Sequence, residues 1–92
     1  MNRITVKDLE RVVLRINRET GNPETSYSKK GDKYTANIGN YHLDGAYGGY
    51  SLHQMDNESG GVRDTLRCGH IPKRELYDRM NAFLDGLEVK KA

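Results

Sequence analysis

The spacing of the apolar residues changes twice along the chain, and these changes limit the folds that it can adopt. Near the N-terminus the apolar residues recur at the helical period of about 3.6 residues, as Leu9, Val12, Val13 and Ile16. From Ser26 to Met55 they alternate with polar residues, which is typical of half-buried strands. The helical period returns in Leu76, Met80, Phe83, Leu84 and Leu87. The pattern predicts an α+β fold in which an N-terminal and a C-terminal helix lie on one face of an antiparallel sheet of three to four strands.

Both predicted helices carry signals for their ends. The first helix is expected to begin directly after Thr5, which has the spacing of a capping box with Asp8. Gly21 is expected to end this helix, because glycine readily adopts the left-handed conformation found there. Pro72 suits the first turn of the last helix, which is predicted to stop near Gly86.

The region between the helices is predicted to form antiparallel strands joined by turns. The alternation slips by one residue at Gly39-Asn40, which predicts a β-bulge. A glycine-rich turn at 44–49 leads into a return strand at 50–55, and Val62–Cys68 is predicted to be a further extended segment. We expect three tyrosines to be half-buried between the sheet and the helices: Tyr34, Tyr41 and Tyr50.

The composition favours one lean, folded domain that comprises residues 1–92. Leu, Ile, Val and Phe account for 18 of the 92 residues, close to the level of disordered chains, but the net charge is only +2 and the apolar residues are periodic. The single cysteine, Cys68, cannot form an internal disulfide, and the N-terminus has no apolar signal-peptide core, so a reducing cytosolic setting is expected. No apolar run approaches the ~20 residues of a membrane span, so we expect no membrane partner.

Cys68 and the histidines are the candidates for catalysis or metal binding. A catalytic thiol would need a lowered pKa and a third, orienting group, and the sequence indicates neither. Cys68 and His70, with His42 and His53, match none of the strong metal-binding spacings, such as paired C-x-x-C. The glycines at 45–49 precede a strand instead of a helix and therefore do not predict a phosphate loop. We predict that the protein is not an enzyme and has no catalytic residue, metal site, cofactor or small-molecule substrate.

Basic side chains are the first candidates for contact with a partner. The most regular group stands nearly in line along the first helix: Lys7, Arg11, Arg15 and Arg18. The others are Lys29 and Lys30 at the first turn, Arg63 and Arg67 on the exposed face of the last strand, and Lys73 and Arg74 at the start of the last helix. Each could instead belong to a solvated face balanced by the acidic residues Glu10, Glu19, Glu75 and Asp78.

Tyrosines are concentrated in the glycine-rich strand region. Four of the six tyrosines lie between Tyr34 and Met55, in a chain without tryptophan. Tyrosine offers a large and stiff contact surface and is enriched at protein interfaces. Tyr47, within the glycine-rich turn, is the predicted interface anchor.

Two stretches resemble a family of small phage and prophage proteins: NYHLDGAYGGYSLH at residues 40–53 and GHIPKRELY at residues 69–77. The resemblance runs from about Tyr34 to Leu87. A protein of about this size is similar to phage-encoded anti-CRISPR proteins that inhibit the type I-F surveillance complex. The resemblance implies a non-enzymatic inhibitor that acts in the cytoplasm of the infected bacterial host. It would dock on the Cas proteins, and possible contact with the guide RNA is implied as well.

Two functions of different classes follow from these observations. The first is a protein-binding inhibitor that stops the CRISPR surveillance complex from binding target DNA. The second is a small phage accessory protein that binds nucleic acid directly through its basic residues. A direct binder would hold free DNA at low salt and lose it steeply as salt rises, whereas an inhibitor would ignore free DNA and co-elute with the assembled complex.

Overall fold

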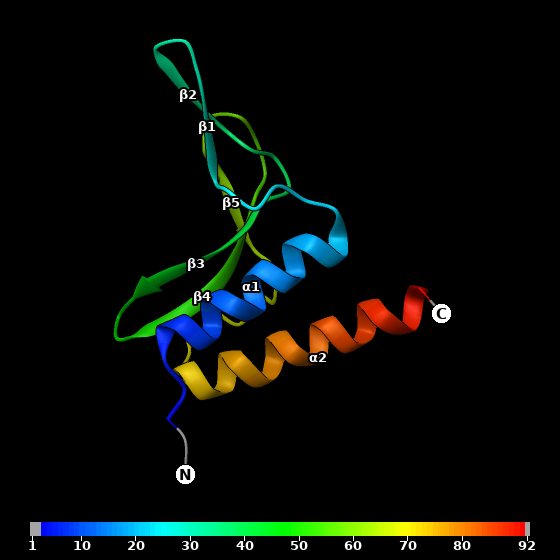
Figure 1. Ribbon diagram of the computed structural model, residues 1–92. Coiled ribbons are helices and arrows are strands. Elements are labelled where there is room, and N and C mark those ends of the chain that lie inside the picture. The colour runs from blue at the N-terminus through cyan, green and yellow to red at the C-terminus, as the bar shows by residue number, and fades with distance from the viewer. Residues whose placement is uncertain (1–2, 92) are drawn as a thin grey trace.

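Two helices cover one face of a three-stranded antiparallel sheet in the computed structural model, which describes residues 3–91 except for the side chains of Lys30, Lys90 and Lys91 (Figure 1). The order of elements is α1 (Val6–Thr20), β1 (Tyr27–Lys30), β2 (Lys33–Ala36), β3 (Tyr41–Ala46), β4 (Gly49–Met55), β5 (Val62–Asp64) and α2 (Lys73–Lys91). The predicted α+β class and the helix–strands–helix order are confirmed. Strands β3, β4 and β5 pair in that order, while β1 and β2 form a separate two-stranded hairpin.

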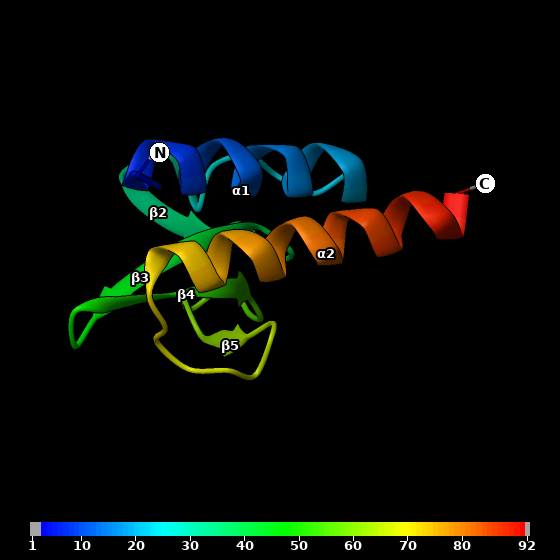
Figure 2. The same cartoon turned by 90° about the horizontal axis from the view of Figure 1, so that it is seen from below.

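The two helices pack against each other and against the same side of the sheet. Helix α1 contacts β3, and α2 contacts β4. Figure 2 shows both helices on one side of these strands. The β1–β2 hairpin projects away from the helices at one end of the molecule, and we call it the arm (Figure 1). No helix within residues 3–91 is long and apolar enough to cross a membrane.

Helix α1 begins and ends where the sequence predicts. The Thr5 hydroxyl accepts a hydrogen bond from the Asp8 N–H at 3.2 Å, and the Asp8 carboxylate accepts one from the Thr5 N–H at 2.9 Å. At the other end Gly21 has φ 70°, and its N–H donates to the carbonyl of Arg18 at 3.2 Å. The N–H of Asn22 donates to the carbonyl of Asn17 at 2.9 Å, which completes a Schellman motif.

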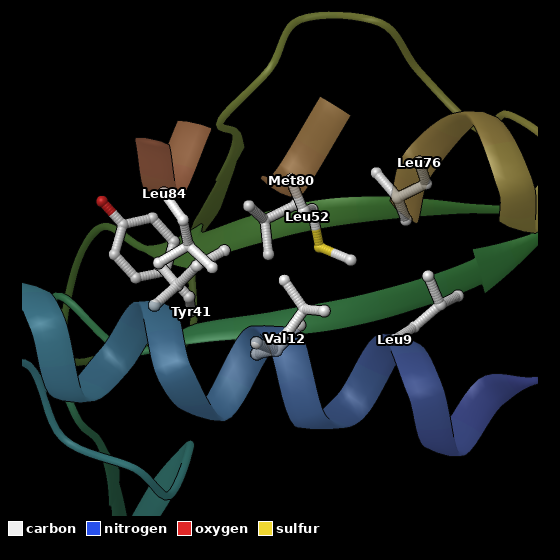
Figure 3. Packing of buried hydrophobic residues seen from close by; sticks show 9 residues of the cluster. Leu9, Val12, Tyr41, Leu52, Leu76, Met80 and Leu84 are labelled. Carbon is white, nitrogen blue, oxygen red and sulfur yellow. The ribbon is translucent and has the colours of Figure 1, made fainter. Parts of the chain in front are cut away.

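The core lies between the helices and the strands, where the two predicted apolar stripes meet (Figure 3). Leu9 and Val12 come from α1, and Leu52 comes from β4. Leu76 and Met80 come from α2, and both are fully buried. The remaining members of the buried cluster are Val13, Ile16, Tyr41 and Leu84, with Phe83 and Leu87 partly buried beside them.

The predicted β-bulge at Gly39-Asn40 is wrong, because the chain leaves one sheet and enters another there. Strand β2 ends at Ala36 and β3 begins at Tyr41. Asn40 is 1% exposed, and its side chain donates to the carbonyl of Pro23 at 2.8 Å and accepts from the hydroxyl of Ser26 at 2.9 Å. These bonds hold the crossing in a fixed turn.

Two residues near this crossing are more exposed in the structure than the sequence predicts. The alternation predicts that Ile38 shares the core face of Tyr41, but Ile38 is 55% exposed. Tyr34, predicted to be half-buried, is 69% exposed on the arm. The two residues lie outside the sheet that the helices cover, so no helix is present to bury them.

The last strand is shorter than predicted, and the last helix is longer. Strand β5 stops at Asp64, because the Asp64 carboxylate accepts hydrogen bonds from the N–H groups of Arg67 at 3.1 Å and Gly69 at 2.8 Å. The chain turns around this carboxylate, and Arg67 adopts φ 55°. Helix α2 continues through Gly86 to Lys91, because one exposed glycine costs a helix only about 1 kcal/mol.

Candidate functional site

The β3–β4 hairpin carries the candidate site at its tip and on the face away from the helices. Its strands pair in register from Tyr41 opposite Gln54 to Ala46 opposite Gly49. Tyr47 and Gly48 form the connecting turn with φ 54° and 75°. Two central residues with positive φ are the signature of a type I′ turn, which matches the twist of the strands and therefore makes a rigid hairpin.

Tyr47 occupies this turn at an energetic cost. Its side chain is 99% exposed, and its φ is positive. A bulky residue in the left-handed region is a rare outlier, since Asn, Asp and Gly are the residues that normally fill the first position of such a turn. The ring makes an edge contact with His70, with centroids 5.9 Å apart. The tyrosine therefore contributes a projecting ring in a place where the fold favours a smaller residue.

Side chains alternate between the two faces of the hairpin, and this alternation puts its two histidines on the face away from the helices. Leu43 and Leu52 pair with each other and pack toward the helices. The neighbouring pair, His42 and His53, must point to the opposite face, because successive residues of a strand alternate. Asp44 lies two residues after His42 and shares this face.

His70 reaches the same face from the segment that joins β5 to α2. The next residue, Ile71, pairs with Tyr50 through two backbone hydrogen bonds of 2.9 and 3.0 Å. Gly49 allows this close approach, since a Cβ atom at that position would lie 3.0 Å from the backbone nitrogen and oxygen of Ile71. The backbone pairing fixes His70 over the end of the hairpin.

Asp44, His53 and His70 form a cluster in which one potential ligand atom of each residue lies within 4.8 Å of the others. Nε2 of His70 and Oδ2 of Asp44 are 2.6 Å apart, and the rings of His53 and His70 have centroids 6.1 Å apart. The hydrogen bond with His70 holds the pKa of Asp44 below its usual value; burial opposes this shift, and the other histidines add to it. We call these three residues the Asp-His-His cluster.

His42 lies beside the cluster, and its ring makes an edge contact with His53 at 6.0 Å. Burial is the main cause that lowers the pKa of His42, and the electrostatic interaction with the His53 ring lowers it further. Within the described residues, its Nδ1 atom is buried and has no hydrogen-bond partner. His42 therefore combines a lowered pKa with a buried ring nitrogen that has no hydrogen-bond partner in the described part of the chain.

Cys68 is not part of this cluster. Burial, followed by the nearby Asp64 carboxylate, raises the pKa of the Cys68 thiol. A raised pKa lowers the fraction of thiolate, which is the reactive form. Cys68 therefore does not supply the histidine cluster with a reactive thiolate.

The basic row on α1 is exposed, but each of its arginines faces a carboxylate. The pairs are Arg11–Asp8 at 3.5 Å, Arg15–Glu88 at 3.0 Å and Arg18–Glu24 at 3.5 Å. Exposed pairs of this kind contribute between about 0 and 1 kcal/mol each and are easily exchanged for other partners. Lys7 lies on the same exposed side of the helix. The row remains available to an anionic partner, although its positive potential is reduced.

The other predicted contact residues are distributed over separate parts of the molecule. Arg63 and Arg67 line one cleft of 320 Å³ with Tyr41 and Phe83. Lys73 lines another, of 450 Å³, beneath the hairpin tip. The remaining three lie elsewhere: the Lys29 ammonium is 5.9 Å from the Tyr34 ring on the arm, Arg74 is exposed on α2, and the side chain of Lys30 lies outside the described residues. The structure thus brings Lys73 to the glycines that flank Tyr47, but the basic side chains that it describes do not form one patch.

The Asp-His-His cluster is the part of the site that sequence reasoning missed. The type I′ turn predicts the register of the hairpin, and this register places Asp44 and His53 on one face. His70 carries no such signal, because its position depends on a backbone bridge to Tyr50 that lies far away in sequence.

The chain matches no family model, no curated protein and no solved structure. A function is therefore inferred from the geometry of the site.

Proposed function

We propose that this protein is a phage-encoded, non-enzymatic inhibitor that binds the type I-F CRISPR surveillance complex and blocks its binding of target DNA. The observation that carries the proposal is Tyr47, a tyrosine that is 99% exposed at the tip of a rigid hairpin with a positive φ. Strained residues that the fold itself does not need are concentrated at sites of function. The resemblance of residues 40–53 and 69–77 to small phage proteins supports the choice of partner.

The hairpin tip has the properties of an interface anchor. A tyrosine on a rigid turn loses little conformational entropy when it is buried by a partner, and such aromatic anchors dominate interface energies. Lys73 and the glycines beneath the tip offer a positive and closely approachable surface beside it. A Cas protein surface that accepts an aromatic ring next to an acidic residue would fit this tip.

Tyr47→Asn tests the anchor, because it is expected to weaken binding without lowering stability. Asparagine tolerates the left-handed conformation, so the free energy of unfolding is expected to stay the same or to rise by up to ~1 kcal/mol. Loss of the ring is expected to weaken binding to the purified surveillance complex by about tenfold or more. Urea denaturation measures the first effect, and biosensor binding to the immobilised complex measures the second.

Tyr34→Ala is the matched control, because Tyr34 is also an exposed tyrosine but lies on the arm. Its affinity for the complex is expected to equal that of the wild type. If Tyr47→Asn binds the complex with the affinity of the wild type, the hairpin tip is not part of the interface.

The α1 row is tested by replacing Arg11 and Arg15 together with Glu. Both side chains are exposed and off the core stripe, so the fold is expected to remain intact. Binding is expected to fall several-fold, and more at low salt than at high salt, if the row faces an anionic part of the complex. Arg79→Glu, which changes the charge of an exposed arginine on α2, serves as the control. Equal affinity of the double variant and the wild type would exclude α1 from the contact surface.

Direct nucleic-acid binding is the second candidate, and one observation favours it. Two arginines and two aromatic residues line the same cleft: Arg63, Arg67, Tyr41 and Phe83. The two arginines can contact phosphates and the partly buried Phe83 can stack on a base, whereas Tyr41 belongs to the buried cluster. Gel shifts with single-stranded and duplex DNA, followed across a salt series, distinguish the two functions. Binding of free DNA that is lost steeply on added salt would show that the protein is a nucleic-acid binder and not the proposed inhibitor.

A further inference from the structure

We propose that Asp44, His53 and His70 form a binding site for a divalent transition-metal ion of the zinc class. The three side chains come from β3, from β4 and from the segment before α2, and their potential ligand atoms lie within 4.8 Å of one another. The proposal rests on this geometry and does not depend on the identity of the macromolecular partner.

The chemistry of the three donors matches this class of ion. Two imidazole nitrogens and one carboxylate oxygen are a common ligand set for Zn²⁺, whereas Ca²⁺ and Mg²⁺ prefer oxygen alone. Zinc bonds of about 2.0 to 2.2 Å in a tetrahedron place the donor atoms about 3.3 to 3.6 Å apart. The ligand atoms of the cluster lie within 4.8 Å of one another, so small side-chain movements bring them to this spacing, and the 2.6 Å approach of Asp44 to His70 has to widen. A rotation of the exposed Asp44 side chain achieves this without moving the backbone.

The backbone around the cluster is fixed, which keeps the ordering cost of metal binding low. Asp44 and His53 lie within paired strands, and His70 precedes the backbone bridge between Ile71 and Tyr50. Metal sites bind tightly when their ligands are held in place before the ion arrives. The side chains of Asp44 and His70 are 45% and 21% exposed, so an ion can enter from solvent.

His42 is a second and independent observation at this site. Its Nδ1 atom is buried and without a hydrogen-bond partner among the described residues, and its ring touches that of His53. A buried nitrogen without a partner is destabilising and calls for an explanation. A water bound to an ion held by His53 would be a hydrogen-bond donor on the side of His53 that the His42 ring contacts. Three protein ligands also leave a tetrahedral ion one open position.

The test uses the untagged full-length chain, first stripped with EDTA and then titrated with Zn²⁺ in a calorimeter. We expect one ion per chain and a melting temperature that rises with the zinc concentration, because the ion binds only the folded state. Co²⁺ is the spectroscopic probe, and a tetrahedral site is expected to produce strong visible absorption. No heat and no Co²⁺ spectrum at millimolar metal would overturn the proposal.

Variants assign the ligands. Asp44→Asn, His53→Gln and His70→Gln are each expected to weaken Zn²⁺ binding by at least tenfold, while circular dichroism shows an unchanged fold. Cys68→Ser and Asp56→Asn change a thiol and an exposed carboxylate outside the cluster, and both are expected to bind as the wild type does. Binding that depends on Cys68, or that survives all three ligand substitutions, would show that the cluster is only a hydrogen-bonded network.

Discussion

Leu76→Ala is expected to lower the free energy of unfolding by about 2 to 5 kcal/mol. Leu76 is fully buried on α2 and lies in the same cluster as Leu9, Leu52 and Met80 (Figure 3). Truncation removes apolar contacts from both helices and the sheet at once, and the fixed backbone of β3 and β4 limits how far the cavity can collapse. A small domain has a total stability of only about 5 to 15 kcal/mol, so this variant is expected to lose a large fraction of its stability.

Guanidinium denaturation followed by far-ultraviolet circular dichroism measures this loss. Val89→Ala is the matched control, because Val89 lies on the same helix but is 75% exposed. Its unfolding free energy is expected to change by less than ~0.5 kcal/mol. Phe83→Ala is expected to fall between the two, since Phe83 is only partly buried. A loss below about 1 kcal/mol for Leu76→Ala would contradict the central position of this residue.

Asn17→Ala is expected to cost about 2 to 4 kcal/mol, although it removes only a small polar side chain. Asn17 is 1% exposed, and its amide bonds both backbone groups of one residue at the outer edge of β3. Its Nδ2 donates to the carbonyl of Tyr41 at 3.0 Å, and its Oδ1 accepts from the N–H of Tyr41 at 2.7 Å. The asparagine thus takes the place of a neighbouring strand. Without it, a buried N–H and a buried carbonyl both lose their partners.

Asn81→Ala provides the comparison, because Asn81 bonds only a carbonyl of its own helix. Because Asn81 makes a bond only within its own helix and alanine has the better helix propensity, the free energy of unfolding is expected to stay within ~0.5 kcal/mol of the wild type. Hydrogen exchange adds a local measurement. The Tyr41 amide is expected to exchange faster in Asn17→Ala than in a core variant of equal stability. Equal protection in the two variants would show that the hydrogen bonds from the Asn17 side chain do not protect the Tyr41 backbone.

The helices could be predicted from the sequence because their signals are local. The capping pair of Thr5 and Asp8, the end at Gly21 and the apolar stripes act over a few residues, and all of them are found in the structure. The division of the strands into two sheets could not be predicted. It depends on Asn40, whose partners Pro23 and Ser26 lie 17 and 14 residues away in the sequence.

The candidate site was predictable only where it is local to the hairpin. Tyr47 was identified from the glycine-rich turn, and its side chain is exposed. The spacing of His53, His70 and Cys68 gave no indication of a metal site, but ligand spacing in sequence is informative only when the ligands share one local motif. Here Asp44 replaces the cysteine, and tertiary pairing brings in His70.

The separate pairing of β1 and β2 also has a practical consequence. At its base the arm is tied to the body by the Ala36 N–H, which donates to the carbonyl of Glu58 at 3.2 Å, and it is closed by the Asn37 N–H, which donates to the carbonyl of Ser26 at 2.8 Å. Its outer turn at Gly31-Asp32 is exposed and contributes nothing to the buried cluster. Extra length at such a loop adds little closure entropy. A fluorophore or an affinity peptide inserted between Gly31 and Asp32 would report on the molecule while leaving the hairpin tip, the cluster and both helices as they are.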